Sequence, residues 1–255
     1  MPFLKKYPIV ADYLPINTKR RSGLAVSPSI KFIVAHDTGN SGSTARQNVN
    51  YYKASANEIF ASAHLFVDDK EIIECVPALT ALPEKAWHVR YDVSGDNQMY
   101  GYDANDAAVG VEYCFGPNIN SAEAYQRYVW TLAYICYTFN LNPQTAIIGH
   151  FVLDPSRKTD PRSGLAASGR SYEQLLADVK NEYNNCQNTN MKMQLIRIAN
   201  SPKVYAIGAD GKRYWIFNEE TFNTGRAMGL WGDFSEVQVV PSDSHPDGHA
   251  IILVK

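Results

Sequence analysis

The sequence lacks an excess of either charge and lacks long apolar runs. Its 255 residues include 24 Lys and Arg against 26 Asp and Glu, a formal net charge of −2. Proteins that coat nucleic acid carry basic stripes that displace counterions, so we expect no nucleic-acid partner. A membrane-spanning helix needs about 20 apolar residues in succession, so we expect no membrane partner either. With 45% hydrophobic residues the chain can still bury a substantial core.

Cysteines are few and scattered along the chain. Cys75, Cys114, Cys136 and Cys186 form no C-x-x-C pair and are too sparse for a disulfide scaffold, which fits folding in a reducing cytosol. The amino-terminal residues hold no apolar run of signal-peptide length. We therefore expect synthesis in the cytoplasm without a signal peptide, and release by another protein if the substrate lies outside the membrane.

The sequence pattern of residues 1–185 predicts an α/β domain. Residues 30–36 and 145–149 are almost entirely apolar, as expected for strands that are covered on both faces. Capping residues and three-to-four spacing of apolar positions indicate helices between such strands. The expected strands are 30–36, 64–69, 71–76, 108–115 and 145–149, and the expected helices are 44–54, 121–142 and 171–185.

A polar stretch at residues 186–192 predicts a linker, and residues 193–255 predict a small β-rich module. Such a module is near the lower size limit for independent folding. Residues 191–255 carry seven basic and seven acidic side chains, so no electrostatic bias indicates a partner. The expected strands are 195–198, 204–207, 213–217, 237–240 and 250–254.

Two histidines follow buried strands, and an aspartate lies in a nearby loop. His36 and His150 each stand where a core strand ends, and Asp160 lies ten residues after His150. A lone histidine in such a place is more often a core side chain bonded to a carbonyl. Two histidines that each stand at the end of a buried strand, with a carboxylate nearby, favour a shared Zn²⁺ site. Three protein ligands leave the fourth coordination position of the ion to water.

Glu112 and Lys158 are candidates for proton transfer and charge stabilisation. Glu112 stands on the apolar strand 108–115, and its carboxylate points either to solvent or into a cleft; the strand alone does not decide. Burial in a cleft would raise its pKa toward the working pH of a general base. Lys158 is either a solvated surface lysine or, two residues from Asp160, a cation placed to stabilise an oxyanion.

His64, Trp87 and His88 have apolar neighbours and are weaker candidates. Each histidine could be a substrate-contacting cleft residue, an alternative metal ligand or a satisfied core side chain. We place His64, Trp87 and His88 at the rim of a substrate cleft. His245 and His249 flank a Pro-Asp-Gly turn, for which a plain loop is the better interpretation.

Taken together, these residues resemble the zinc-dependent N-acetylmuramoyl-L-alanine amidases of the type 2 family, which includes phage endolysins, bacterial autolysins and peptidoglycan recognition proteins. The resemblance covers roughly residues 28–180 and implies a mixed central sheet flanked by helices. It is carried by five ordered segments: Ala35–Ala45, Ala61–Asp69, Lys85–His88, Gly110–Glu112 and Gly149–Pro161.

The resemblance implies roles for the candidate residues. His36, His150 and Asp160 look like the zinc ligands, Glu112 like the base that activates the zinc-bound water, and Lys158 like the partner of the oxyanion. The family cleaves the amide between the lactyl group of N-acetylmuramic acid and the L-alanine of the stem peptide in peptidoglycan.

The sequence departs from many members of the family at two positions. Asp160 stands where many relatives have a cysteine ligand, and this harder oxygen ligand should leave the zinc more electrophilic and more easily removed by chelators. Ala63 stands where several members carry a catalytic tyrosine. Glu112 must then carry more of the proton transfer, or another group such as His88 assists it.

The resemblance also sets out three functions for the whole chain. The first is a phage endolysin that is made in the bacterial cytoplasm, passes through a holin-made membrane hole and lyses the host wall. The second is a bacterial autolysin or a muropeptide-recycling amidase, and the third is a non-catalytic peptidoglycan-binding protein. The tail looks similar to aromatic β-modules of wall-active proteins and is expected to bind a wall polymer. Its aromatic residues either form its core or, at Tyr205, Tyr214 or Trp231, present sugar-stacking faces.

Overall fold

The computed structural model describes residues 3–187, 192–208 and 210–253. Its internal contacts divide the described chain into two compact units, with the boundary in the sequence between Cys186 and Gln187. Most of the expected linker, residues 188–191, lies outside the described part. Within that part, no helix combines the length and the apolar character that are needed to cross a membrane.

The first unit is built on a mixed sheet of six strands in the order β1-β4-β3-β5-β2-β6. Strand β2 lies between β5 and β6 and runs parallel to both. Strand β3 is parallel to β5 and pairs with β4 as an antiparallel hairpin, and β1 is parallel to β4. The strands are β1 Ile9–Ala11, β2 Phe32–Asp37, β3 Leu65–Val67, β4 Ile72–Glu74, β5 Ala108–Tyr113 and β6 Ile147–Gly149.

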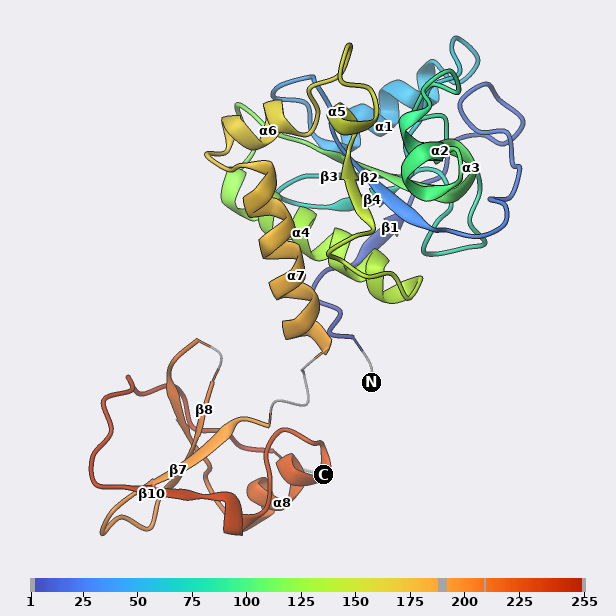
Figure 1. The fold of residues 1–255 in the computed structure, drawn as a ribbon. Coiled ribbons are helices and arrows are strands. Elements are labelled where there is room, and N and C mark those ends of the chain that lie inside the picture. Colours follow the sequence, from blue (N-terminus) through green and yellow to red (C-terminus); the bar gives the residue numbers. More distant parts are fainter. Residues whose placement is uncertain (1–2, 188–191, 209, 254–255) are drawn as a thin grey trace. The chain divides into compact units, whose positions relative to one another are not determined.

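Helices cover both faces of this sheet (Figure 1). Helices α4 and α7 lie on one side, and α1, α2 and α5 lie on the other. The core between sheet and helices includes the fully buried rings of Tyr128 and Trp130 from α4. The helices are α1 Ala45–Ala54, α2 Gly95–Tyr100, α3 Ala104–Ala107, α4 Ser121–Thr138, α5 His150–Leu153, α6 Arg162–Ala167 and α7 Tyr172–Gln187.

Local signals account for several of these elements. All six residues of β2 are buried, as the unbroken apolar pattern predicts for a central parallel strand. Thr44 caps α1 in a reciprocal capping box with Gln47. Helix α4 ends at Thr138, earlier than the expected residue 142, because Asn140 takes a positive φ of 53° that a helix cannot continue through. The expected α/β class with a mixed, helix-flanked sheet is confirmed.

The second unit holds a separate sheet of four strands in the order β10-β7-β8-β9. Its core is centred on Trp231, which is fully buried and donates its indole N–H to the Phe222 carbonyl. Its elements are β7 Gln194–Ile198, β8 Val204–Ile207, β9 Arg213–Trp215, α8 Glu219–Ala227, the 3₁₀ turn η1 Phe234–Glu236 and β10 Gln238–Val240.

Two expectations for this module are wrong. Residues 250–254 form no strand within the described chain, which ends at Leu253, and contribute a single bridge between Ile216 and Ile251. Trp231 cannot present a sugar-stacking face, because it fills the core. The sequence analysis also missed α8, which Asn218 caps by accepting a hydrogen bond from the Thr221 N–H.

Candidate active site

The carboxyl ends of three neighbouring parallel strands bring the main candidates together. His36 on β2 is paired in register with Glu112 on β5. On the other side of β2, Ala35 is paired with Gly149, so His150 follows directly at the end of β6. Because parallel strands end at the same edge of a sheet, three segments far apart in the sequence deliver their side chains to one place.

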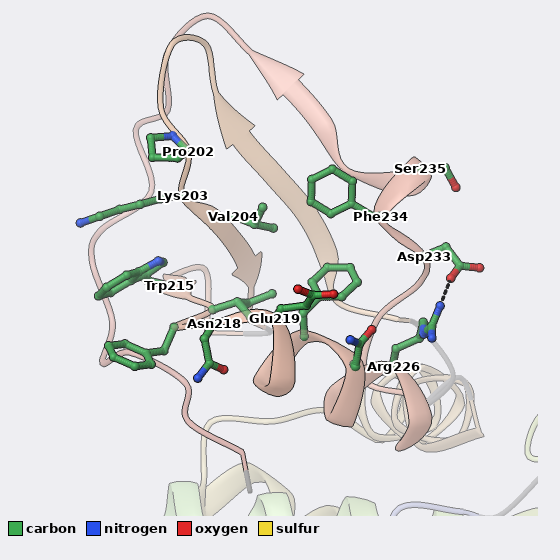
Figure 2. Close-up of a pocket in the computed structure, with 14 residues that line it drawn as sticks. Pro202, Lys203, Val204, Trp215, Asn218, Glu219, Arg226, Asp233, Phe234 and Ser235 are labelled. Atoms are coloured by element: carbon green, nitrogen blue, oxygen red, sulfur yellow. Dashed lines mark hydrogen bonds and ion pairs between the residues drawn. The ribbon is translucent and has the colours of Figure 1, made fainter.

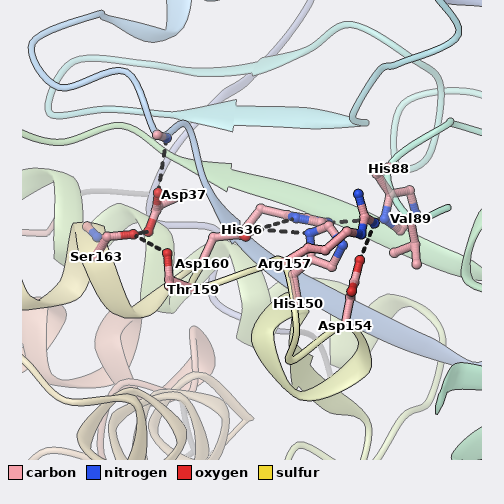
Figure 3. Close-up of polar contacts among 12 residues, drawn as sticks. His36, Asp37, His88, Val89, His150, Asp154, Arg157, Thr159, Asp160 and Ser163 are labelled. Atoms are coloured by element: carbon pink, nitrogen blue, oxygen red, sulfur yellow. Dashed lines mark hydrogen bonds and ion pairs between the residues drawn. The ribbon is translucent and has the colours of Figure 1, made fainter. Parts of the chain in front are cut away.

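The two imidazoles of His36 and His150 meet at one carboxylate oxygen (Figure 3). Nδ1 of His36 lies 2.8 Å and Nδ1 of His150 lies 3.0 Å from Oδ2 of Asp160. One candidate ligand atom from each residue lies within 4.8 Å of the other two. Burial opposes ionisation of Asp160, but the hydrogen bonds to His150 and His36 outweigh it and hold the pKa of this carboxyl well below its ordinary value.

This donor set fits a zinc ion. Two imidazoles and one carboxylate are the ligands of a catalytic Zn²⁺ site, and a set of three leaves one tetrahedral position open. A histidine must be neutral to bind a metal, and burial lowers the pKa of His36 to about 4 despite its bond to Asp160. The side chains of His36, His150 and Asp160 need to move only slightly apart for one shared ion to replace their direct contacts.

Asp37, beside His36, fixes the loop that carries Asp160. Its Oδ2 accepts hydrogen bonds from the Ser163 hydroxyl at 2.9 Å and from the Gly164 N–H at 2.8 Å, while Oδ1 accepts the Gly39 N–H at 3.0 Å. A Cβ on Gly164 would lie 2.8 Å from the Cβ of Asp37, so the close approach depends on that glycine. Sequence reasoning missed Asp37, although a carboxylate next to a candidate ligand was a usable signal.

His150 is held in place by the hydroxyl of Tyr172 on α7. Strand β6 lies at the edge of the sheet, so its outer backbone groups have no neighbouring strand. The hydroxyl of Tyr172 accepts the Gly149 N–H at 2.9 Å and donates to the Ile147 carbonyl at 3.3 Å. These two bonds satisfy the backbone where the strand turns into the His150 helix.

His88 contacts His36 on the side away from Asp160. The two rings meet through Nε2 of His36 and Nδ1 of His88 at 3.1 Å. With the proton of His36 on Nε2, His88 accepts it and the Nδ1 lone pair of His36 stays available to a metal. The His88 ring lies against Gly110, where a Cβ would be 2.7 Å from the ring. The expected cleft position of His88 thus includes a direct bond to a candidate ligand.

Glu112 points into a pocket of about 360 Å³ that is lined by the three candidate ligands. Its Oε2 is buried and has no hydrogen-bond partner among the described residues. Burial, together with the charges of Asp160 and Asp37, raises the pKa of Glu112 well above its ordinary value, while the charge of Lys158 lowers it. The sequence left open whether the Glu112 carboxylate points to solvent or into a cleft, and the structure shows that it points into the cleft.

Lys158 and Trp87 also line this pocket. The Lys158 ammonium makes no ion pair among the described residues, although its charge acts on both Glu112 and His36. The indole N–H of Trp87 is buried without a partner in the described chain. Both side chains therefore offer hydrogen-bond donors at the place where a substrate would lie.

His64 is the candidate that the structure removes from the cleft. It is fully buried, its Nδ1 accepts the Gly110 N–H at 3.0 Å, and its Nε2–H donates to the Glu84 carbonyl at 2.9 Å. Burial lowers its pKa to about 4, so both ring nitrogens serve the backbone of a neutral imidazole. The expectation of a rim position is wrong for His64, and it is a satisfied core side chain.

Comparisons with known proteins agree with this geometry. The family model described as N-acetylmuramoyl-L-alanine amidase matches residues 26–163. The N-acetylmuramoyl-L-alanine amidase BlyA of Bacillus subtilis (strain 168) is 30% identical over 179 residues, which are 67% of this chain and 45% of BlyA. A probable N-acetylmuramoyl-L-alanine amidase of Bacillus licheniformis is 28% identical over 64% of this chain and 44% of its own length. The chain thus spans less than half the length of these curated relatives.

Solved structures share the fold. Staphylococcus aureus hydrolase AmiA, in complex with its ligand, matches 72% of this chain and 87% of its own with a TM-score of 0.58 and 23% identity. The catalytic domain of XlyA matches 68% of this chain and 99% of its own with a TM-score of 0.54 and 24% identity. Because the family model covers more than half of the sequence, with the clustered His36, His150 and Asp160 inside its bounds, the chain belongs to the N-acetylmuramoyl-L-alanine amidase family.

Proposed function

We propose that this chain hydrolyses the amide bond between the lactyl group of N-acetylmuramic acid and the L-alanine that begins the stem peptide of peptidoglycan. One observation carries the proposal: two imidazole Nδ1 atoms meet on one oxygen of Asp160, in a pocket that Glu112 also enters. Membership of the amidase family supports the choice of substrate.

His36, His150 and Asp160 would hold Zn²⁺ through Nδ1, Nδ1 and a carboxylate oxygen. When bound, zinc polarises the scissile carbonyl and lowers the pKa of an attacking water from about 15.7 to about 7. The chain prepares this site in advance. Asp37 fixes the loop of Asp160, and His88 fixes the ring of His36.

Glu112 acts as general base and then as general acid. Its Oε2 has no partner within the described chain, so it is available to accept a proton from the attacking water. Its raised pKa makes it a stronger base than an exposed carboxylate, and the same proton can then pass to the leaving amine of L-alanine. Ala63 stands where several members of the family carry a catalytic tyrosine, so in this proposal the carboxylate carries the transfer.

Lys158 stabilises the negative charge that develops on the carbonyl oxygen. It lines the same pocket as Glu112, and no carboxylate in the described chain neutralises it by an ion pair. A fixed cation at a developing oxyanion contributes about 3–4 kcal/mol to transition-state stabilisation, by analogy with loss of a single oxyanion-hole donor.

The biological setting that we propose is lysis of a host wall by a phage endolysin. The second unit supports this setting, because an enzyme that trims soluble wall fragments has no need of an added module with its own core. In this setting the protein is made in the bacterial cytoplasm, leaves through a holin-made opening, and attaches to the wall through the second unit.

Mass analysis of wall digests tests the proposed reaction. Zinc-loaded protein should release new amino-terminal L-alanine and unmodified N-acetylmuramic acid from purified walls, and a chelator should abolish the release. Glu112→Gln should keep its zinc but lose turnover by about 10²–10⁴-fold. Release of new reducing sugars or of peptide fragments cut elsewhere would refute the amidase assignment. Wall binding without any freed alanine would favour the recognition protein.

A further inference from the structure

The second unit contains a groove of about 930 Å³. One wall comes from the end of β9 and the residue before β8, and the other from α8 and η1. Figure 2 shows Trp215 with Lys203 on one side of this groove and Phe234 on the other. We call it the module groove; it is lined only by residues 202–235 and belongs entirely to this unit.

Two phenylalanines in the module groove are exposed at a cost to the free protein. Phe217 is 49% exposed and Phe234 is 64% exposed, while the core around Trp231 is closed without them. Full burial of such a side chain stabilises a protein by about 1.5–3 kcal/mol, so a module this small gives up much by leaving two of them in water. Exposed aromatic residues on facing walls are typical of a binding surface.

The aromatic walls are arranged as platforms. Phe217 packs against Trp215 with ring centroids 5.3 Å apart, and Phe234 packs against Phe222 with centroids 5.8 Å apart. Each exposed ring is thus held against another ring of the groove lining. Supported aromatic faces suit ligands with a flat array of C–H groups, such as the pyranose ring of a sugar.

The charges of the module groove cancel. Arg226 is paired with Asp233 at 2.6 Å, and the remaining cation, Lys203, lies 4.4 Å from the centre of the Trp215 ring. Glu219 balances Lys203. A polyanion such as a phosphate-rich wall polymer needs surplus basic side chains, and a cationic ligand needs the opposite surplus, so the groove selects for neither.

Hydrogen-bonding groups without an internal partner are present between the platforms. Glu219, Asn223 and Ser235 line the groove, and their side chains make no hydrogen bond or ion pair within the described chain. Their oxygens and amide can therefore pair with hydroxyl and acetamido groups of a ligand. Pockets that combine apolar walls with a few such groups use the former for affinity and the latter for orientation.

We propose that the module groove binds a neutral, N-acetylated amino-sugar strand, stacking its pyranose rings on Phe217 and Phe234. This inference rests on the proposed wall-directed function, because the glycan backbone of peptidoglycan is such a strand. The module would then hold the enzyme on the polymer whose side amide the first unit cuts. Stacking, and hydrogen bonds to an uncharged ligand, depend little on ionic strength.

The test uses the full chain with Glu112→Gln, which binds without cleaving. Two probes are used: a hexamer of β-1,4-linked N-acetylglucosamine, and purified walls before and after acid removal of their anionic polymers. The double variant Phe217→Ala/Phe234→Ala is compared with Met228→Ala/Val239→Ala, which removes two side chains that are 62% and 56% exposed outside the groove. Both variants remove surface side chains, and thermal melting checks that both remain folded.

The expected result is that the groove variant binds hexamer and stripped walls about ten- to a hundredfold more weakly, from the loss of two aromatic contacts. The control variant should bind like the parent at both low and high salt. Equal binding by the two variants, or no hexamer binding by the parent, would overturn the proposal. Binding that is lost when the anionic polymers are removed, or when salt is added, would instead identify a polyanion as the ligand. Amide cleavage of a soluble muropeptide is measured separately with the protein that retains Glu112. This measurement shows whether the proposed reaction stands even if the groove assignment fails.

Discussion

Replacing His88 should weaken zinc binding without touching a zinc ligand. Nδ1 of His88 lies 3.1 Å from Nε2 of His36. If Nδ1 of His36 binds zinc, the ring proton must be on Nε2, where Nδ1 of His88 can accept it. Loss of such an outer hydrogen bond typically costs 10–100-fold in metal affinity, which corresponds to about 1.4–2.7 kcal/mol. We therefore expect His88→Phe, which keeps a flat ring over Gly110, to raise the zinc Kd by about that factor.

Competition with a chromophoric chelator measures this Kd directly, and the rise in melting temperature on adding zinc gives an independent readout. His88→Asn supplies a rescue, because its side-chain oxygen can accept the His36 proton from nearly the position of Nδ1. Trp87→Phe is the matched control, since it alters the same pocket without contacting a ligand. If His88→Phe bound zinc as tightly as the parent and as His88→Asn, the positioning role of His88 would be refuted.

Three further changes test other parts of the site. Lys158→Met should lower kcat by about 10²–10³-fold, and should move the acid limb of the pH profile upward. The base works only above its pKa, and Lys158 lowers the pKa of Glu112, so loss of the cation raises that limb; an unmoved limb would contradict the coupling. Asp37→Ala removes the acceptor of three hydrogen bonds and should lower the free energy of unfolding by about 2–4 kcal/mol in a denaturant titration, whereas a loss below 0.5 kcal/mol would show that the loop holds itself. Gly110→Ala places a Cβ 2.7 Å from the His88 ring and should weaken zinc binding as His88→Phe does; unchanged affinity would mean that the ring moves freely.

The cluster of candidate metal ligands could be predicted from the sequence because it depends on strong local patterns. Residues 30–36 and 145–149 are apolar throughout, and such segments become central strands whose histidines fall at the carboxyl edge. The register that pairs His36 with Glu112 could not be predicted, since no local feature fixes the alignment of parallel strands distant in sequence. It was this pairing that decided the orientation of the carboxylate.

The two weaker histidines show where local reasoning ends. His64 and His88 have similar apolar neighbours, yet one binds the backbone of β5 and the other binds His36. Both contacts depend on Gly110, whose missing side chain leaves room for the His88 ring and whose N–H is accepted by His64. Only the assembled sheet distinguishes the two roles.

The second unit was harder to predict because its helix and strands are short and depend on a small number of specific contacts between residues distant in sequence. Helix α8 has only nine residues, and its formation rests on the packing of Phe222 against Trp231. Residues 250–254 have the β-branched composition of a strand, but the described ones form only one isolated bridge, between Ile251 and Ile216. In so small a module the tertiary contacts override the local propensities.

The central claim is that His36, His150 and Asp160 bind one zinc ion. A crystal of the zinc-loaded protein, measured on both sides of the zinc absorption edge, tests it directly. We predict a single anomalous peak per chain, about 2.0–2.2 Å from Nδ1 of both histidines and from a carboxylate oxygen of Asp160. A zinc ion bound elsewhere in the chain, with these three side chains still bonded to one another, would contradict the account.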